Sequence, residues 1–151
     1  MSAANASGPV LFAYDGSELA KLAIEEAGRL LETGADALVL TVWQPFDVGF
    51  LPAADLQLDA AQVIEVRKAA EQTAADGAAL AKEAGFRARS AAVEGAPTWK
   101  AIATFADEHD ARVIVLGSHG RSGLAGALVG SVAGSVAAHS RRSVLIAHRR
   151  P

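Results

Sequence analysis

The sequence predicts an α/β fold with a single domain, in which a five-stranded parallel sheet carries helices on both faces, as in Rossmann-like proteins. Three observations predict it. Five short apolar runs alternate along the chain with stretches whose apolar residues recur at helical spacing. The runs are apolar at consecutive positions, which is typical of parallel strands buried on both faces. The chain has 151 residues, 51% of them hydrophobic, and this is enough for one packed core.

The first half of the chain supplies two strands and one complete helix. In order, we predict a strand over 9–14, a turn over 15–17, a helix over 19–31, a strand over 37–43 and a loop over 44–55. Ser17 is suited to cap the first helix, because its hydroxyl can accept from a free backbone N–H. That helix is predicted by apolar residues that recur at helical spacing: Leu19, Leu22, Ala23, Ala27, Leu30 and Leu31.

The second half continues the alternation. In order, we predict a helix over 56–84, a strand over 86–93, a helix that begins near Pro97, a strand over 113–116, a helix over 131–140 and a final strand over 143–147. Arg87 and Arg89 interrupt the third strand, as expected near a sheet edge. Gly77 falls inside the long helix, where it costs about 1 kcal/mol relative to alanine.

Composition and charge exclude several classes of function. The formal net charge of −3 argues against nucleic acid as a main partner. The absence of cysteine excludes disulfides and thiolate chemistry and suits a cytoplasmic protein. No apolar run approaches the ~20 residues of a membrane span, so we expect no membrane partner. Residues 1–8 are small and polar, and predict a disordered tail ahead of one domain over 9–151.

A glycine-rich run after the fourth strand carries the functional signal. It reads Gly-Ser-His-Gly-Arg-Ser-Gly over 117–123, and Gly130-Ser131 follows at the start of the next helix. Glycine lets an anion approach the backbone, and a helix N-terminus adds free N–H donors and about half a positive charge. The run therefore predicts a phosphate site. It matches neither a Walker loop nor G-x-G-x-x-G.

The predicted topology places a second signal beside the first. Ligands bind at the carboxyl ends of parallel strands. The first strand ends in Asp15-Gly16-Ser17 and the fourth in the glycine-rich run. If these strands are neighbours, the site lies between their two ends.

The spacing of these glycines resembles the G-x2-G-x9-G-(S/T) pattern of the universal stress protein family, in its ATP-binding branch. The opening strand and turn over 10–18, the segment over 93–97 and the closing strand over 144–147 are also similar to that family. The resemblance implies strand order 3-2-1-4-5 and a homodimer formed through the fifth strand, 143–147. One departure is that Arg142-Ser143 stands where the family often has Cys-Pro, which affects entry into that strand.

The resemblance also implies the residues around an adenine nucleotide. Asp15 would lie near the adenosine with Ala13 beside it, and Val42 would offer backbone contacts to the adenine edge. Leu116 and Gly117 would line the ribose. The phosphates would be surrounded by Gly120, Gly130, Ser131 and Val132.

The chemistry of the residues agrees with this assignment, and leaves alternatives. The hydroxyl of Ser131 and the charge of Arg121 suit phosphate, and Asp15 can accept from ribose or adenine. The glycines could instead serve close helix packing, and Asp15 could bond its own turn. His119 could contact phosphate or be a loop histidine near the pocket mouth, and Arg121 could be a solvated charge.

We therefore expect an ATP-binding stress protein that acts as a sensor or regulator. Mg²⁺ is expected with the phosphates, although no cluster of carboxylates identifies a protein ligand for it. No nucleophile is paired with a base, so turnover should be slow or absent. One alternative is a slow ATP hydrolase or nucleotidyl-transferring enzyme that uses His119 or Asp15 for proton transfer. Another is a dimerisation module without a ligand.

Overall fold

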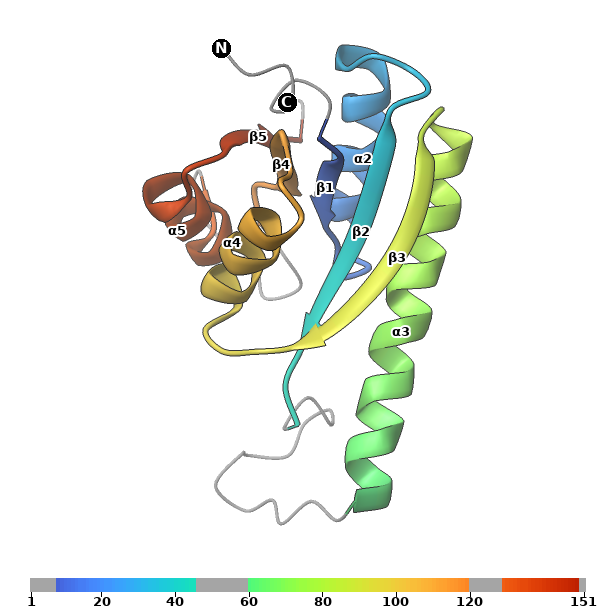
Figure 1. The fold of residues 1–151 in the computed structure, drawn as a ribbon, viewed down its shortest axis with the longest axis vertical. Helices are drawn as coiled ribbons and strands as arrows, with labels where there is room; N and C mark the ends of the chain where they lie inside the picture. The colour runs from blue at the N-terminus through green and yellow to red at the C-terminus, as the bar shows by residue number, and fades with distance from the viewer. Residues whose placement is uncertain (1–7, 46–59, 120–128, 150–151) are drawn as a thin grey trace.

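The computed structural model describes residues 8–45, 60–119 and 129–149, and forms a five-stranded parallel sheet between two layers of helices (Figure 1). The sheet order is β3-β2-β1-β4-β5, so the fold prediction is confirmed. The elements are β1 (Val10–Ala13), α2 (Glu18–Leu30), β2 (Asp36–Trp43), α3 (Ala60–Glu83), β3 (Arg87–Glu94), α4 (Thr98–Glu108), β4 (Val113–Gly117), α5 (Ser131–His139) and β5 (Ser143–Ala147).

Central strand β1 fixes the register of its two neighbours. Val10 pairs with Ala37 of β2 on one side and with Val113 of β4 on the other, and both pairings are parallel. The carboxyl ends of β1, β2 and β4 therefore lie next to one another at the same end of the sheet, as the sequence predicts for the first and fourth strands. Strands β3 and β5 form the two outer edges.

Two apolar cores lie on opposite faces of the sheet. Phe12 and Tyr14 of β1 pack with α2 and α3, and Phe12 meets Phe86 edge-on with ring centroids 5.3 Å apart. Leu11 of β1 packs on the other face with α4 and α5. Successive β1 side chains thus enter different cores, which explains why the strand is apolar at every position.

Helix α2 buries the alanines of its predicted apolar stripe, Ala23 and Ala27, more fully than the leucines. Its buried residues are Ala20, Ala23, Ile24 and Ala27, whereas Leu30 is 63% exposed. The physical reason is close packing, because small side chains let α2 approach the sheet. A Cβ on Gly117 of β4 would lie 2.8 Å from the backbone carbon of Leu19. The Ser17 cap is confirmed, since its hydroxyl accepts from Ala20 N–H at 3.2 Å.

Helix α3 is described from Ala60, and the predicted start at residue 56 lies outside the described residues. Its buried glycine, Gly77, lies against the sheet. A Cβ there would be 2.6 Å from Tyr14 Cδ1 and 2.8 Å from Val39 Cγ1. Gly77 therefore lowers the helix propensity of α3 but allows the helix to pack closely against β1 and β2.

Arg142 anchors the entry to β5. Its Nε donates to Asp107 at 2.9 Å, and its Nη1 donates to Asp110 at 2.8 Å and to the Ala111 carbonyl at 3.2 Å. The hydrogen bond to Asp110, with that to Asp107, raises the pKa of Arg142 above its ordinary value. Edge strand β5 is thereby tied to the turn between α4 and β4.

We expect Gly77→Ala to destabilise the protein by about 1–3 kcal/mol, because the added methyl group overpacks the Tyr14–Val39 contact. Helix propensity alone would give a gain of about 1 kcal/mol. Gly134→Ala on α5 is the matched control, since the nearest atom to its Cβ position is 3.8 Å away. Urea unfolding measures both variants. Equal or higher stability of Gly77→Ala relative to wild type would contradict the packing account.

Candidate functional site

The carboxyl ends of β1 and β2 are incompletely covered on the α4/α5 face. Val42 is the only residue of β2 after Asp36 that is not buried, and Ala13 is the only such residue of β1. Both belong to the apolar cluster on that face, together with Leu116 at the end of β4 and Val132 in α5. The structure therefore brings four of the predicted site residues to one face of the sheet.

Strand β2 holds the end of β1 in place. Tyr14 N–H donates to the Leu40 carbonyl at 2.9 Å, and the buried Thr41 hydroxyl donates to the Tyr14 carbonyl at 2.8 Å. The Tyr14 ring lies in the core on the opposite face, where burial raises the pKa of its phenol. This anchoring fixes the position from which Asp15 leaves the sheet.

Asp15 forms part of the turn that follows β1. Its Oδ1 accepts from Ser17 N–H at 2.9 Å, which is the backbone role that the sequence leaves as an alternative. Asp15 is partly buried.

The end of β4 is held to both β5 and α5. Ser118 N–H donates to the Ala147 carbonyl at 2.8 Å, and the Ser118 carbonyl accepts from Gly130 N–H. A Cβ on Gly130 would lie 2.9 Å from the Ser118 oxygen. Gly130 is therefore required by close approach of two backbone segments, and its own N–H is already used within the chain.

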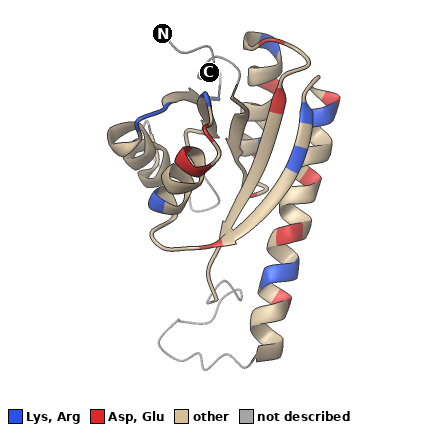
Figure 2. Cartoon of the chain, viewed as in Figure 1, with Lys and Arg blue, Asp and Glu red and all other residues tan. Residues whose placement is uncertain are grey.

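The N-terminus of α5 offers backbone donors at this place. Gly130 is the N-cap and gives no side-chain cap, and the first helical bond runs from Gly134 N–H to the Gly130 carbonyl at 2.9 Å. The N–H groups of residues 131–133 therefore have no partner within the helix. No acidic residue lies in the first turn, and Figure 2 shows α5 free of Lys, Arg, Asp and Glu. The positive end of the helix dipole is thus not compensated by the helix itself.

Ser118 and His119 follow β4 directly. Ser118 is 3% exposed, and its Oγ lies 3.2 Å from Nδ1 of His119. Nε2 of His119 is buried and has no hydrogen-bond partner among the described residues. Two further predicted residues, Gly120 and Arg121, lie outside the described residues.

Most of the predicted site residues that the structure describes fall into three groups in space. Ala13, Val42, Leu116 and Val132 share one apolar cluster, Gly130, Ser131 and His119 lie where β4 meets α5, and Asp15 lies in the turn after β1. Gly117 is turned toward α2 and serves close packing with Leu19. Sequence reasoning did not single out Thr41, although a lone hydroxyl inside an apolar strand is a signal of a buried hydrogen bond.

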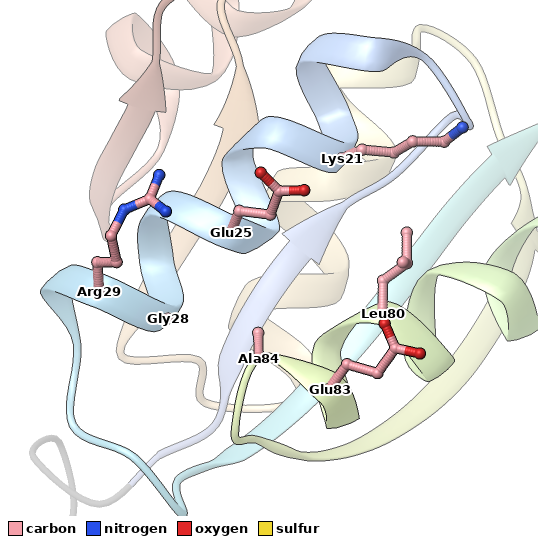
Figure 3. A pocket seen from close by; sticks show the side chains of 7 residues that line it. All are labelled: Lys21, Glu25, Gly28, Arg29, Leu80, Glu83 and Ala84. Carbon is pink, nitrogen blue, oxygen red and sulfur yellow. The ribbon is translucent and has the colours of Figure 1, made fainter.

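A groove of about 310 Å³ lies elsewhere, between α2 and α3 (Figure 3). Its lining residues are Lys21, Glu25, Gly28, Arg29, Leu80, Glu83 and Ala84. The four charged residues are two of each sign, so no net charge selects a ligand. It lies on the α2/α3 side of the sheet and includes no predicted site residue.

Residues 8–45, 60–119 and 129–149 contain no group of three or more His, Asp or Glu side chains placed to hold a metal ion. No helix in these ranges has the length and apolar character needed to cross a membrane.

Comparison with known proteins gives the family context. The model of the "Universal stress protein family" matches residues 7–148. Universal stress protein Rv2623 from Mycobacterium tuberculosis is 32% identical over 146 residues, which cover 92% of this chain and 44% of that protein. This chain thus spans less than half the length of that relative.

Solved structures agree in fold. The hypothetical protein MJ0577 superposes with a TM-score of 0.75 at 21% identity, over 96% of this chain and 98% of that one. A universal stress protein in complex with cAMP superposes with a TM-score of 0.65 at 28% identity, over 95% and 98% of the two chains.

Proposed function

This chain belongs to the universal stress protein family, and from that premise we propose that it binds an adenine nucleotide, ATP in the first instance, as a sensor or regulator in a stress response. The single observation that carries the proposal is the uncompensated N-terminus of α5 at the carboxyl end of β4. Free N–H groups and a positive dipole at a helix start favour a phosphate. The solved relative in complex with cAMP supports an adenine nucleotide as the ligand class.

The phosphates are proposed to lie at the start of α5. The donors are the backbone N–H groups of Ser131 and Val132 and the Ser131 hydroxyl, which is exposed. Gly130 contributes by keeping Ser118 and α5 close together, since its N–H donates to Ser118. Gly120 and Arg121, with Mg²⁺, complete the proposed phosphate contacts.

The nucleoside is proposed to lie over the carboxyl ends of β1 and β2. Ala13 and Val42 are partly exposed there in otherwise buried strands, and Leu116 lies in the same cluster. An adenine ring can bury its face against such aliphatic side chains, while the backbone of Val42 meets its edge. Asp15 is placed in the adjoining turn to accept from ribose or adenine.

A binding role is favoured over an enzyme by the chemistry of the described residues. A hydrolase needs a base that positions water and charges that clamp the γ-phosphate. One oxygen of Asp15 is engaged by its own turn, and Nδ1 of His119 meets the Ser118 hydroxyl. Asp15 and His119 thus serve the local backbone and a neighbouring hydroxyl in these two contacts. The proposed protein holds its nucleotide with slow turnover or none.

We expect ATP to stabilise the wild-type protein against thermal unfolding by roughly 2.7 kcal/mol at a hundredfold excess over the dissociation constant. Ser131→Asp should abolish this stabilisation, because its carboxylate repels the phosphates at the start of α5. The same carboxylate should leave the empty protein at least as stable, since it complements the helix dipole. Differential scanning calorimetry with and without ATP and Mg²⁺ measures both effects.

Ala138→Glu is the matched control for this variant. It adds the same charge to α5 at an exposed position near the other end of the helix. We expect it to retain the ATP effect. Loss of ATP stabilisation in both variants, or in neither, would contradict the placement of phosphate at the α5 N-terminus.

The chain is further proposed to form a homodimer through β5. This strand is an edge of the sheet, and Val144, Leu145 and Ile146 are only partly buried in one chain. An edge strand with partly exposed apolar side chains is a template for pairing with a second copy.

Sedimentation equilibrium should give twice the 15.5 kDa mass of one chain for the wild type. We expect Val144→Lys to give the monomer mass, because two lysines would be brought together in a water-poor interface. Val93→Lys places the same change on the other edge strand, β3, and should leave the dimer intact. A wild-type monomer, or dissociation by Val93→Lys alone, would refute the β5 interface.

A further inference from the structure

The pair Ser118–His119 contains a buried hydrogen-bonding group whose partner is not found among the described residues. The Ser118 hydroxyl is almost fully enclosed, and its hydrogen-bond partner there is Nδ1 of His119 at 3.2 Å. The opposite ring nitrogen, Nε2, is also buried, and no described residue lies within hydrogen-bonding reach of it. The two ends of the imidazole therefore have different surroundings.

The hydroxyl decides which ring nitrogen carries the proton. A serine hydroxyl has one proton to donate, and a neutral imidazole has one N–H and one acceptor nitrogen. If Nδ1 donated to Ser118, the hydroxyl proton would be buried without an acceptor in the described part of the chain, at a cost of about 1–3 kcal/mol. The hydroxyl therefore donates to Nδ1, and the ring proton resides on Nε2.

The edge of the ring formed by Cδ2 and Nε2 lies beside the residue at which α5 begins. A Cβ on Gly130, the N-cap of α5, would lie 3.5 Å from Cδ2 of His119, the carbon bonded to Nε2. This edge of the ring thus borders the same N-terminus whose backbone N–H groups have no partner within the helix. A buried donor beside other free donors calls for an acceptor that can serve all of them.

We propose that Ser118 fixes the tautomer of His119, so that Nε2–H donates to a phosphoryl oxygen of the nucleotide held at the α5 N-terminus. This inference rests on the proposed function. His119 is a ligand-binding residue in it, and Ser118 is a positioning residue that acts through His119 without touching the ligand. The neutral ring donates, so no imidazolium is required for binding.

The tautomer is measured first, in the protein without nucleotide. Long-range proton–nitrogen correlation spectra of protein with ¹⁵N-labelled histidine distinguish an Nε2–H ring from an Nδ1–H ring. We expect His119 to be the Nε2–H form, with its signals assigned by their loss in His119→Gln. Ser118→Ala should shift the ring toward a mixture of the two forms, and Ser118→Thr should restore the wild-type spectrum because it keeps the hydroxyl.

Ligand affinity is measured next, by calorimetric titration with ATP and with adenosine as the probe that lacks phosphate. We expect Ser118→Ala and His119→Leu to weaken ATP about tenfold and to leave adenosine unchanged. His119→Gln should retain most of the ATP affinity, since its amide nitrogen can replace Nε2–H. His139→Leu is the matched control, because His139 is exposed and stacks on Trp99 away from Ser118.

The outcomes separate this inference from the proposed function. A wild type that binds ATP while His119 is the Nδ1–H form or doubly protonated would overturn the inference alone. Equal loss of ATP and adenosine in Ser118→Ala would also overturn it, because that pattern indicates a purely structural role. A wild type that binds neither ATP nor adenosine would overturn the proposed function and this inference with it, whatever tautomer His119 adopts.

Discussion

The hydrogen bond from Gly130 N–H to the Ser118 carbonyl is the contact on which the site depends. It brings the start of α5 against the end of β4, and a side chain at Gly130 would push the two apart. The N–H of Ser118 donates to the Ala147 carbonyl, so Ser118 is tied to β5 as well. Helix α5 is thereby fixed with its positive end at the carboxyl edge of the sheet.

The ends of β1 and β2 provide an apolar surface beside the start of α5. Thr41 holds the end of β1 through the Tyr14 carbonyl, and β1 and β2 each leave one side chain, Ala13 and Val42, partly exposed on the same face. An apolar surface therefore adjoins backbone N–H groups that have no partner within α5. That combination suits a ligand with a flat apolar part and an anionic part, which is the chemistry of a nucleotide.

Much of the fold could be predicted from the sequence because the five apolar runs and their spacing specify a buried parallel sheet. The buried face of α2 could be predicted only in part, because Ala23 and Ala27 of the predicted stripe are buried whereas Leu30 is exposed. Helix propensity likewise does not explain Gly77, because this glycine makes room for Tyr14 and Val39, which come from other parts of the chain. At the site, the glycine motif located the helix N-terminus. Gly117 and Gly130 serve the close packing that the sequence left as an alternative, and only the three-dimensional contacts identify Leu19 and Ser118 as the segments that approach them. Ser118 lay inside the motif, and its link to His119 depends on burial that the sequence does not specify.

The proposed phosphate position is tested most directly by the NMR signals of the backbone amides at the start of α5. Proton–nitrogen correlation spectra of the ¹⁵N-labelled protein, recorded during titration with ATP and separately with adenosine, report on each amide. The account predicts that ATP shifts the amide signals of Ser131, Val132 and Ala133 strongly, whereas adenosine shifts mainly signals at the ends of β1 and β2. Saturation by ATP with the three α5 amides unmoved would contradict it.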